Sequence, residues 1–249
     1  MREVCIDLTP GRIQNAAKHR SGHCMSDSNI DPFASEEITP AISAEWEAKR
    51  RVASALRELT DILVSSSPPV TALDALAERL EDATRGFDTL PRLAGRTAFA
   101  EAGGHGNFRQ LAHELNPISG MSNPLAPPLN VWLEEGSAHG RAKLGWAYEG
   151  PPGSVHGGVV AALFDQFMGI AQALGGQPGM TGTLSLRYHR RTPLHIELQL
   201  RGNLRRTEGR KTLVHAELWA EGILTAECEA LFVRPVSGMP LRPQAPSGV

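Results

Sequence analysis

The 249-residue sequence predicts an α+β domain, in which a strongly bent antiparallel sheet wraps around one long central helix, with an N-terminal helical extension. Apolar residues recur at helical spacing in the first third of the chain, and they alternate with polar residues in the last third. Between early and late strands lies one helix, from Gly157 to about Leu174, that is apolar enough to be buried along its length.

The same patterns divide the chain into four parts. We expect an extended or disordered leader over 1–40, a helical extension over 41–110, the α+β domain over 115–236, and a flexible tail over 237–249. Residues 1–40 mix Ser, Asn, Asp and Gly without a sustained period, which is the basis for the predicted leader.

Composition narrows the functional classes. A net charge of -2 gives no general field to attract nucleic acid or an anionic membrane, so any anion site must be local. Cys5, Cys24 and Cys228 form no C-x-x-C pair, which fits a reducing compartment and predicts a cytoplasmic protein. Glu3 and Asp7 interrupt the stretch that a secretory signal needs, and we find no apolar run of bilayer length, so we expect no membrane insertion.

Two helices are predicted in the extension. Apolar residues from Ile42 to Leu63 recur at helical spacing, with Ser43 as the N-cap, and Thr71–Thr84 forms a second amphipathic helix. Two helices and a turn could form a DNA-binding module. However, 36–88 contains eleven acidic and six basic residues, the opposite of the usual balance for reading phosphates, so we expect no nucleic-acid partner.

The predicted strands follow a loop-like stretch, Ala102–Pro128, that is rich in Gly and Pro. Glu208-Gly209 supplies a turn between two of the strands. Four strands with clear alternation and two weaker candidates are expected at Leu184–Tyr188, His195–Arg201, Val214–Leu218 and Leu224–Ala230, and at Leu129–Glu134 and Arg141–Tyr148.

The start of the central helix is a candidate anion site. A helix N-terminus presents unpaired N–H groups and the positive end of the macrodipole, and Gly157 and Gly158 leave it open to a ligand. Such a terminus can serve as an oxyanion hole in acyl transfer. The alternative is that the two glycines only make a tight entry into the helix.

Asp165 is the one carboxylate in this apolar helix. It follows Gly157 by eight residues, which is about 12 Å along the axis, so the two cannot serve one carbonyl within one chain. A second stripe of small and polar residues would let another subunit approach: Gly158, Ala162, Asp165, Gly169 and Gln172. Two antiparallel helices would then create two shared sites in a dimer. The alternative is a lone Asp on a solvated flank.

The order of several motifs resembles the hotdog-fold acyl-CoA thioesterases. These motifs are G-x-V-H-G-G (153–158), Asp165, Thr181 in G-M-T-G-T-L-S-L-R-Y, Arg191-Thr192-Pro193 and E-G-R-K (208–211). They are most similar to the phenylacetic-acid-degradation (PaaI-like) branch and the related long-chain acyl-CoA thioesterases. The resemblance covers roughly Leu129–Pro235, about half the chain.

The resemblance implies a role for each matching residue. His156 would help hold the thioester, Gly157 would polarise its carbonyl through a backbone N–H, Asp165 would act as nucleophile or base, and Thr181 would order the water or the carboxylate. The coenzyme A (CoA) moiety would be bound by Gly158, Arg210 and Lys211. Arg210 and Lys211 belong to a basic hairpin, and the alternative for them is an ordinary solvent-exposed turn. One departure is that Gly150–Gly153 offers none of the amide side chains found there in some branches.

The sequence therefore predicts an acyl-CoA thioesterase of lipid metabolism. Water or carboxylate attack on a thioester needs oxyanion stabilisation and no metal, so we expect no cofactor besides the CoA thioester substrate. We expect a homodimer or a dimer of dimers (homotetramer) with the active site shared between subunits. Two alternatives remain, a non-catalytic acyl-CoA-binding sensor and a hotdog hydratase. Asp165 favours the enzyme over the sensor, and the His156-Gly157-Gly158 pattern differs from that of the hydratases.

Overall fold

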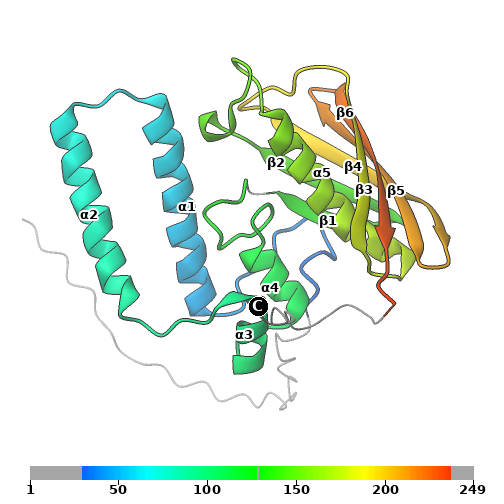
Figure 1. The fold of residues 1–249 in the computed structure, drawn as a ribbon, viewed down its shortest axis with the longest axis horizontal. Coiled ribbons are helices and arrows are strands. Elements are labelled where there is room, and N and C mark those ends of the chain that lie inside the picture. Colours follow the sequence, from blue (N-terminus) through cyan, green and yellow to red (C-terminus); the bar gives the residue numbers. More distant parts are fainter. Residues whose placement is uncertain (1–29, 128, 237–249) are drawn as a thin grey trace, which may run out of the picture.

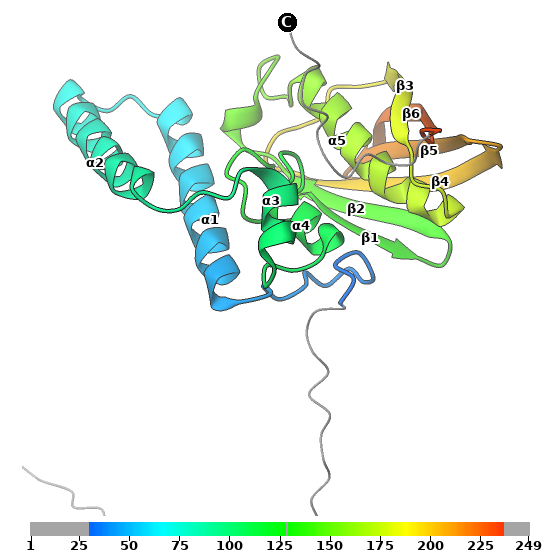
Figure 2. The same cartoon turned by 60° about the horizontal axis from the view of Figure 1, so that its bottom comes forward.

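The computed structural model describes residues 30–127 and 129–236, and the predicted leader up to residue 29 and the predicted tail lie outside them. Six antiparallel strands form one bent sheet in the order β1-β2-β4-β5-β6-β3, and helix α5 lies across one face of it (Figures 1 and 2). This confirms the α+β hotdog fold. The elements are β1 (Asn130–Glu134), β2 (Ser137–Lys143), α5 (Gly157–Ala171), β3 (Met180–Tyr188), β4 (Glu197–Glu208), β5 (Lys211–Ala220) and β6 (Ile223–Val233).

The core lies between α5 and the sheet. Phe164, Phe167 and Met168 project from α5 and are fully buried. Phe167 fits because Gly202 of β4 has no side chain, since a Cβ there would lie 2.6 Å from the Phe167 ring. Alternating burial along β4, β5 and β6 supplies the other side of the core, as the period of two in the sequence predicts.

The central helix lies where the sequence predicts it, but one expectation about its length is wrong. Together with the short 3-10 helix η3 (Gln172–Gly175), it forms a 19-residue segment, Gly157–Gly175, whose length and composition would suffice to cross a membrane. The expectation that no run has this length is therefore wrong. In the fold, the apolar stripe of this segment packs on the sheet and forms part of the main core.

Two predicted elements are corrected. The candidate strand Arg141–Tyr148 instead begins at Ser137 and ends at Lys143, and Trp146–Tyr148 forms a 3-10 helix, η2. The loop-like stretch Ala102–Pro128 contains helix α4 (Phe108–Leu115). This helix begins with a capping box, in which the Asn107 side chain accepts from the third helical N–H and the N-cap N–H donates back to the Gln110 side chain.

The helical extension forms both predicted helices. Helix α1 (Ala44–Ser65) starts at Ser43, whose side chain accepts from the Trp46 N–H, so the predicted N-cap is confirmed. Helix α2 (Val70–Asp88) has no buried residue and stands away from the sheet domain (Figure 1). A shorter helix, α3 (Gly95–Ala102), precedes α4.

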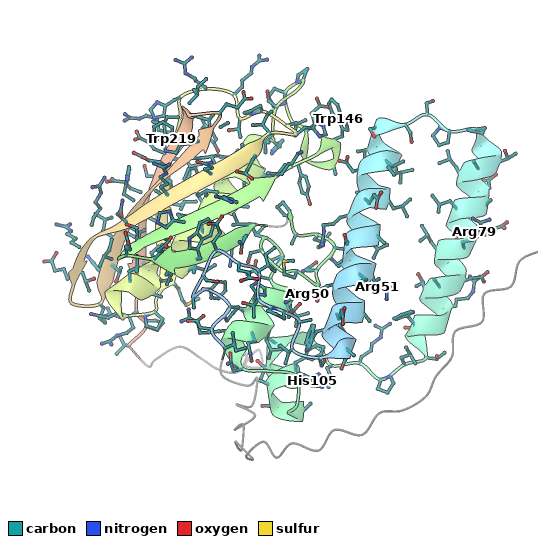
Figure 3. All side chains as sticks on the ribbon, turned by 180° about the vertical axis from the view of Figure 1, so that it is seen from behind. Arg50, Arg51, Arg79, His105, Trp146 and Trp219 are labelled. Atoms are coloured by element: carbon teal, nitrogen blue, oxygen red, sulfur yellow. The ribbon has the colours of Figure 1, made fainter. Side chains whose placement is uncertain are left out.

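A buried ion pair joins α1 to α4. Arg50 lies on the side of α1 nearest the sheet domain (Figure 3), and its guanidinium donates to the Glu114 carboxylate at 2.5 and 3.0 Å. Glu114 is 1% exposed and also accepts from the Ser122 hydroxyl at 2.6 Å. The Arg50 guanidinium also donates to the Thr39 carbonyl at 2.8 Å. These contacts attach the extension to the body of the molecule.

The described end of the leader, 30–40, has no helix or strand but packs on the sheet domain. Phe33 is buried in the main core, and its carbonyl accepts from the Leu133 N–H at 3.0 Å. The Asn130 side chain donates to the Glu36 carbonyl at 2.7 Å. This segment therefore lies along the outer edge of β1, which pairs with no other strand among the described residues.

His113 of α4 should make the fold acid-sensitive. Burial lowers its pKa from 6.5 to about 4, so between these values the unfolded chain binds a proton that the folded chain excludes. Stability is therefore present above pH 6.5 and falls as the pH drops towards 4, by about 2 kcal/mol at pH 5. Urea denaturation at pH 7 and pH 5 should show a smaller difference for His113→Leu than for the wild type. Equal differences in the two proteins would contradict this assignment.

Candidate active site at the start and flank of helix α5

A tight turn before α5 positions its first residues. The His156 N–H donates to the Tyr148 carbonyl at 2.9 Å, and the Val155 N–H donates to the Thr192 carbonyl at 2.8 Å. Gly150 lies directly against this segment, and a Cβ at that position would come 2.6 Å from the His156 Cα. The Gly- and Pro-rich motif therefore sets where α5 begins.

His156 is the N-cap of α5. Its ring Nδ1 accepts from the Gly158 N–H at 3.0 Å, which places the ring proton on Nε2 and leaves Nε2 as an exposed donor. Among the described residues the Gly157 N–H has no acceptor. The helix start thus offers one free backbone donor, at Gly157, and not at Gly158, whose N–H is already used by His156.

A cavity of about 290 Å³ opens at this helix start. Tyr188, the last residue of β3, reaches into the same region, and its hydroxyl donates to the Gly157 carbonyl at 2.8 Å. Burial raises the pKa of the Tyr188 hydroxyl, which remains protonated at neutral pH. The cavity is lined by Pro151, Ser154, Val155, Gly157, Val160, Tyr188, His189, Arg190, Arg191 and Thr192.

Asp165 and Thr181 form the second half of the candidate site. The Thr181 hydroxyl donates to the Asp165 carboxylate at 2.8 Å, and both residues are exposed. An irregularity between Thr181 and Thr183 interrupts the register of β3 with β6, as bulges that redirect a side chain do. The structure therefore brings the Thr181 hydroxyl to the Asp165 carboxylate, a contact that one of the two roles implied for Thr181 requires.

The two halves are far apart within one chain. Gly157 and Asp165 lie eight residues apart on the same continuous helix, about 12 Å along its axis. Gly158 and Asp165 of the predicted small and polar stripe are exposed, and Ala162 and Gly169 are partly buried. Gln172 is not part of this surface, because its buried amide bonds Gly179 through both polar atoms. The predicted stripe is therefore shorter by one residue.

The predicted CoA hairpin lies at the Asp165 end of the domain. Val233 of β6 pairs with both Lys211 and Met180, so the β4–β5 turn is adjacent to the start of β3. A cavity of about 300 Å³ is lined there by Arg210 and Lys211. Arg210 donates to the Arg234 carbonyl at 3.0 Å. In one chain these cations are thus at the opposite end of β3 from Tyr188 and Gly157.

Cys228 of β6 is buried near Asp165 but does not supply a nucleophile. Burial, reinforced by the nearby Asp165 charge, raises the pKa of its thiol to about 12, so the reactive thiolate is absent at neutral pH. Within 30–127 and 129–236 no cluster of three or more His, Cys, Asp or Glu side chains could hold a metal ion.

Sequence reasoning missed three residues of the helix-start cavity, namely Tyr188, Arg190 and Arg191. Arg191 stood within a noted motif, and the basic run Arg187–Arg191 was visible in the sequence, but neither pattern shows which side chains face the cavity.

Comparison with known proteins identifies the family. The model of the thioesterase superfamily matches residues 152–236. A solved structure described as a thioesterase superfamily protein is 36% identical, with a TM-score of 0.64, and the match covers 78% of this chain and 97% of that one. The acyl-coenzyme A thioesterase THEM4 of Mus musculus is 33% identical over 88 residues, or 34% of this chain and 38% of the relative.

THEM4 of Xenopus laevis is 30% identical over 88 residues, which are 34% of this chain and 40% of the relative. This chain therefore spans about two fifths of the length of these curated relatives. The match to the solved relative, by contrast, covers 97% of that chain. It also covers 78% of this chain, so it extends beyond the sheet domain into the helical extension of this chain. On that match, and on the fold described above, the chain belongs to the thioesterase superfamily.

Proposed function

We propose that this protein is an acyl-CoA thioesterase, which hydrolyses an acyl-CoA to a free acid and CoA. The observation that carries the proposal is the Asp165–Thr181 pair, a carboxylate held at 2.8 Å by a hydroxyl on the exposed flank of α5. The free N–H of Gly157 supplies the second requirement, a donor for a developing oxyanion. The activity named for the THEM4 relatives supports the same reaction class.

A dimer would unite the two halves of the site. β3 is an edge strand, and its outer edge has no partner strand in the described chain. If two copies pair antiparallel through this edge about Leu184, the middle residue of β3, then Thr181 of one copy lies opposite Arg187 of the other. Asp165 of the first copy then approaches Tyr188 and Gly157 of the second, because Thr181 holds Asp165 and Tyr188 holds Gly157.

In this site the reaction uses water and groups from the two chains. Asp165 accepts a proton from a water molecule while the water oxygen attacks the thioester carbonyl carbon, or its carboxylate attacks directly and water then hydrolyses the resulting anhydride. The Gly157 N–H stabilises the oxyanion, the carbon–sulfur bond breaks, and CoA leaves as the thiolate. The exposed Nε2–H of His156 is a second donor for the thioester end.

The same pairing would also bring the β4–β5 hairpin of one copy towards the helix start of the other. Lys211 and Arg210 lie at the Thr181 end of β3, so they would approach the site from the side of the copy that supplies Asp165. Their charges suit the 3′-phosphate and pyrophosphate of CoA.

A non-catalytic acyl-CoA sensor is the second candidate. The observation in its favour is α2, an amphipathic helix with no buried residue, which could bind a partner that responds to ligand. Thiol release measured over acyl-CoAs of increasing chain length and over aryl-CoAs separates the two. We expect turnover with at least one substrate, whereas saturable acyl-CoA binding without hydrolysis across the panel would replace the enzyme by the sensor.

Mixing two inactive variants tests the shared site. Asp165→Asn removes the base, and Gly157→Pro removes the free N–H; each homodimer should be inactive. Proline should fold at this position, because it is the first residue of α5 and His156 before it already has an extended backbone, with φ -58° and ψ 132°. After co-refolding, half of the dimers are mixed and each has one intact site, so activity should return to about a quarter of wild type.

Circular dichroism and dimer mass must first show that both variants fold and exchange subunits. If they do and no activity returns, the two residues do not complement each other across a dimer. The thioesterase proposal itself would stand, because it depends on the hydrolysis panel.

A further inference from the structure

The basic run Arg187–Arg191 divides into two groups with different surroundings. Arg187 and His189 both approach the Glu227 carboxylate, at 3.8 and 3.3 Å. The Arg190 and Arg191 guanidinium groups have no hydrogen bond or ion pair with any described residue. Two neighbouring positive charges are thus left without a counter-charge from the described part of the chain.

Two buried threonines fix the backbone of this pair. The N–H groups of His189 and Arg190 both donate to the Thr225 carbonyl, at 2.8 and 3.0 Å. The Thr192 hydroxyl donates to the Thr225 hydroxyl at 3.2 Å, and both residues are buried. The arginines therefore sit on a segment anchored to β6, and not on a loose loop.

The same anchor connects the arginines to the helix start. The Thr192 carbonyl accepts from the Val155 N–H at 2.8 Å, two residues before Gly157, and Ser154 forms a bridge with Pro193. Arg190, Arg191 and Gly157 consequently line one cavity, and no carboxylate is among its lining residues. The positive end of the α5 dipole adds to the field of the two cations there.

We propose that Arg190 and Arg191 bind an anionic group of the thioester substrate and thereby contribute to substrate selection. This rests on the proposed thioesterase function and adds a positioning site to it. The anion can come from two parts of such a substrate, either a phosphate of CoA or a carboxylate at the far end of a dicarboxylic acyl group. Both are acceptors that guanidinium groups bind with paired hydrogen bonds.

The test compares the double variant Arg190→Gln/Arg191→Gln with wild type on substrates that differ in charge. Hexanoyl-CoA carries only the CoA phosphates, hexanoyl-pantetheine carries no phosphate, and glutaryl-CoA adds a carboxylate to the acyl group. We expect KM to rise about 10-fold or more on the substrate that holds the bound anion, with kcat within about two-fold. If the guanidinium groups only supported the fold, their replacement would instead lower Tm and change the kinetics on all three substrates alike.

Each pattern of results has one meaning. An increase on hexanoyl-CoA that disappears on hexanoyl-pantetheine assigns the arginines to a CoA phosphate. An increase confined to glutaryl-CoA assigns them to the acyl carboxylate. Unchanged KM on both CoA substrates, or an equal increase on all three substrates, would overturn the proposal.

Two further measurements keep this test independent of the proposed activity. Arg201→Ala removes an exposed cation from β4, away from the cavity, and should leave every KM unchanged. Calorimetric titration of glutaryl-CoA and hexanoyl-CoA into the catalytically disabled Asp165→Asn variant, with and without the arginine change, measures binding directly. If no substrate is hydrolysed but these affinities still fall about 10-fold, the anion site stands and the thioesterase proposal fails.

Discussion

Replacement of Asp165 by asparagine is expected to lower kcat by about 100-fold or more while acyl-CoA binding stays near normal. Asparagine has the same size, and its side-chain oxygen can still accept from the Thr181 hydroxyl, as the carboxylate does at 2.8 Å. The variant therefore retains the contact with β3 but can neither accept a proton from water nor attack a thioester. Steady-state kinetics on the best substrate of the hydrolysis panel, with calorimetric binding of its CoA thioester, measures both effects.

Asp74→Asn is the matched control, because it removes an exposed carboxylate from α2 and should leave kcat unchanged. Thr181→Val tests the other member of the pair. It should reduce kcat by less than Asp165→Asn, since the carboxylate remains and only its orientation is lost. Wild-type turnover by a folded Asp165→Asn protein would remove Asp165 from the mechanism.

Glu114→Ala is expected to destabilise the protein by about 3–5 kcal/mol, the largest stability effect that we predict. The substitution leaves Arg50, whose side chain is 16% exposed, without its carboxylate, and it leaves the Ser122 hydroxyl without its acceptor. An isolated charge in such a place costs far more than the pair does. Urea denaturation at pH 7, followed by circular dichroism, gives the difference in the free energy of unfolding.

Glu45→Ala provides the comparison. Its carboxylate pairs with Lys49 on the exposed face of α1, where the two side chains are 50% and 36% exposed, and its loss should cost at most about 0.5 kcal/mol. The double variant Arg50→Met/Glu114→Leu should recover part of the stability lost in Glu114→Ala, because no charge is then left unpaired. If Glu114→Ala is no more harmful than Glu45→Ala, the pair does not hold the extension in place.

Much of the fold could be predicted because its determinants are local. The period of two in β4, β5 and β6 reflects alternate side chains on a sheet with one buried face, and the stripe on α5 reflects helical spacing. Ser43 could be recognised as a cap because its partner, Trp46, is three residues away. The helical rise alone separates Gly157 from Asp165, so the sequence also predicted that one chain cannot complete the site.

Local sequence signals for secondary structure were weaker in the glycine-rich stretch before α4. Helix α4 is only eight residues long and follows Gly103, Gly104 and Gly106, so its stretch resembled a loop although the capping box from Asn107 to Gln110 was present. A short helix of this kind is stabilised by packing more than by propensity, and the buried Leu111 and Glu114 show where that packing lies.

The sequence by itself determined the helix and strand periods, the apolar helix that packs on the sheet, and the open start of that helix. It also identified Asp165 and Thr181 as candidate site residues. Only the tertiary structure decided that Thr181 meets Asp165, that Gln172 turns inward to Gly179, and that the basic run splits at Glu227. These contacts join helices and strands to other elements or to the loops beside them. Their geometry depends on strand register and on a bulge, and a shift of one residue reverses the face that every side chain of a strand occupies. The spacing of residues along the sequence does not indicate which strand register forms.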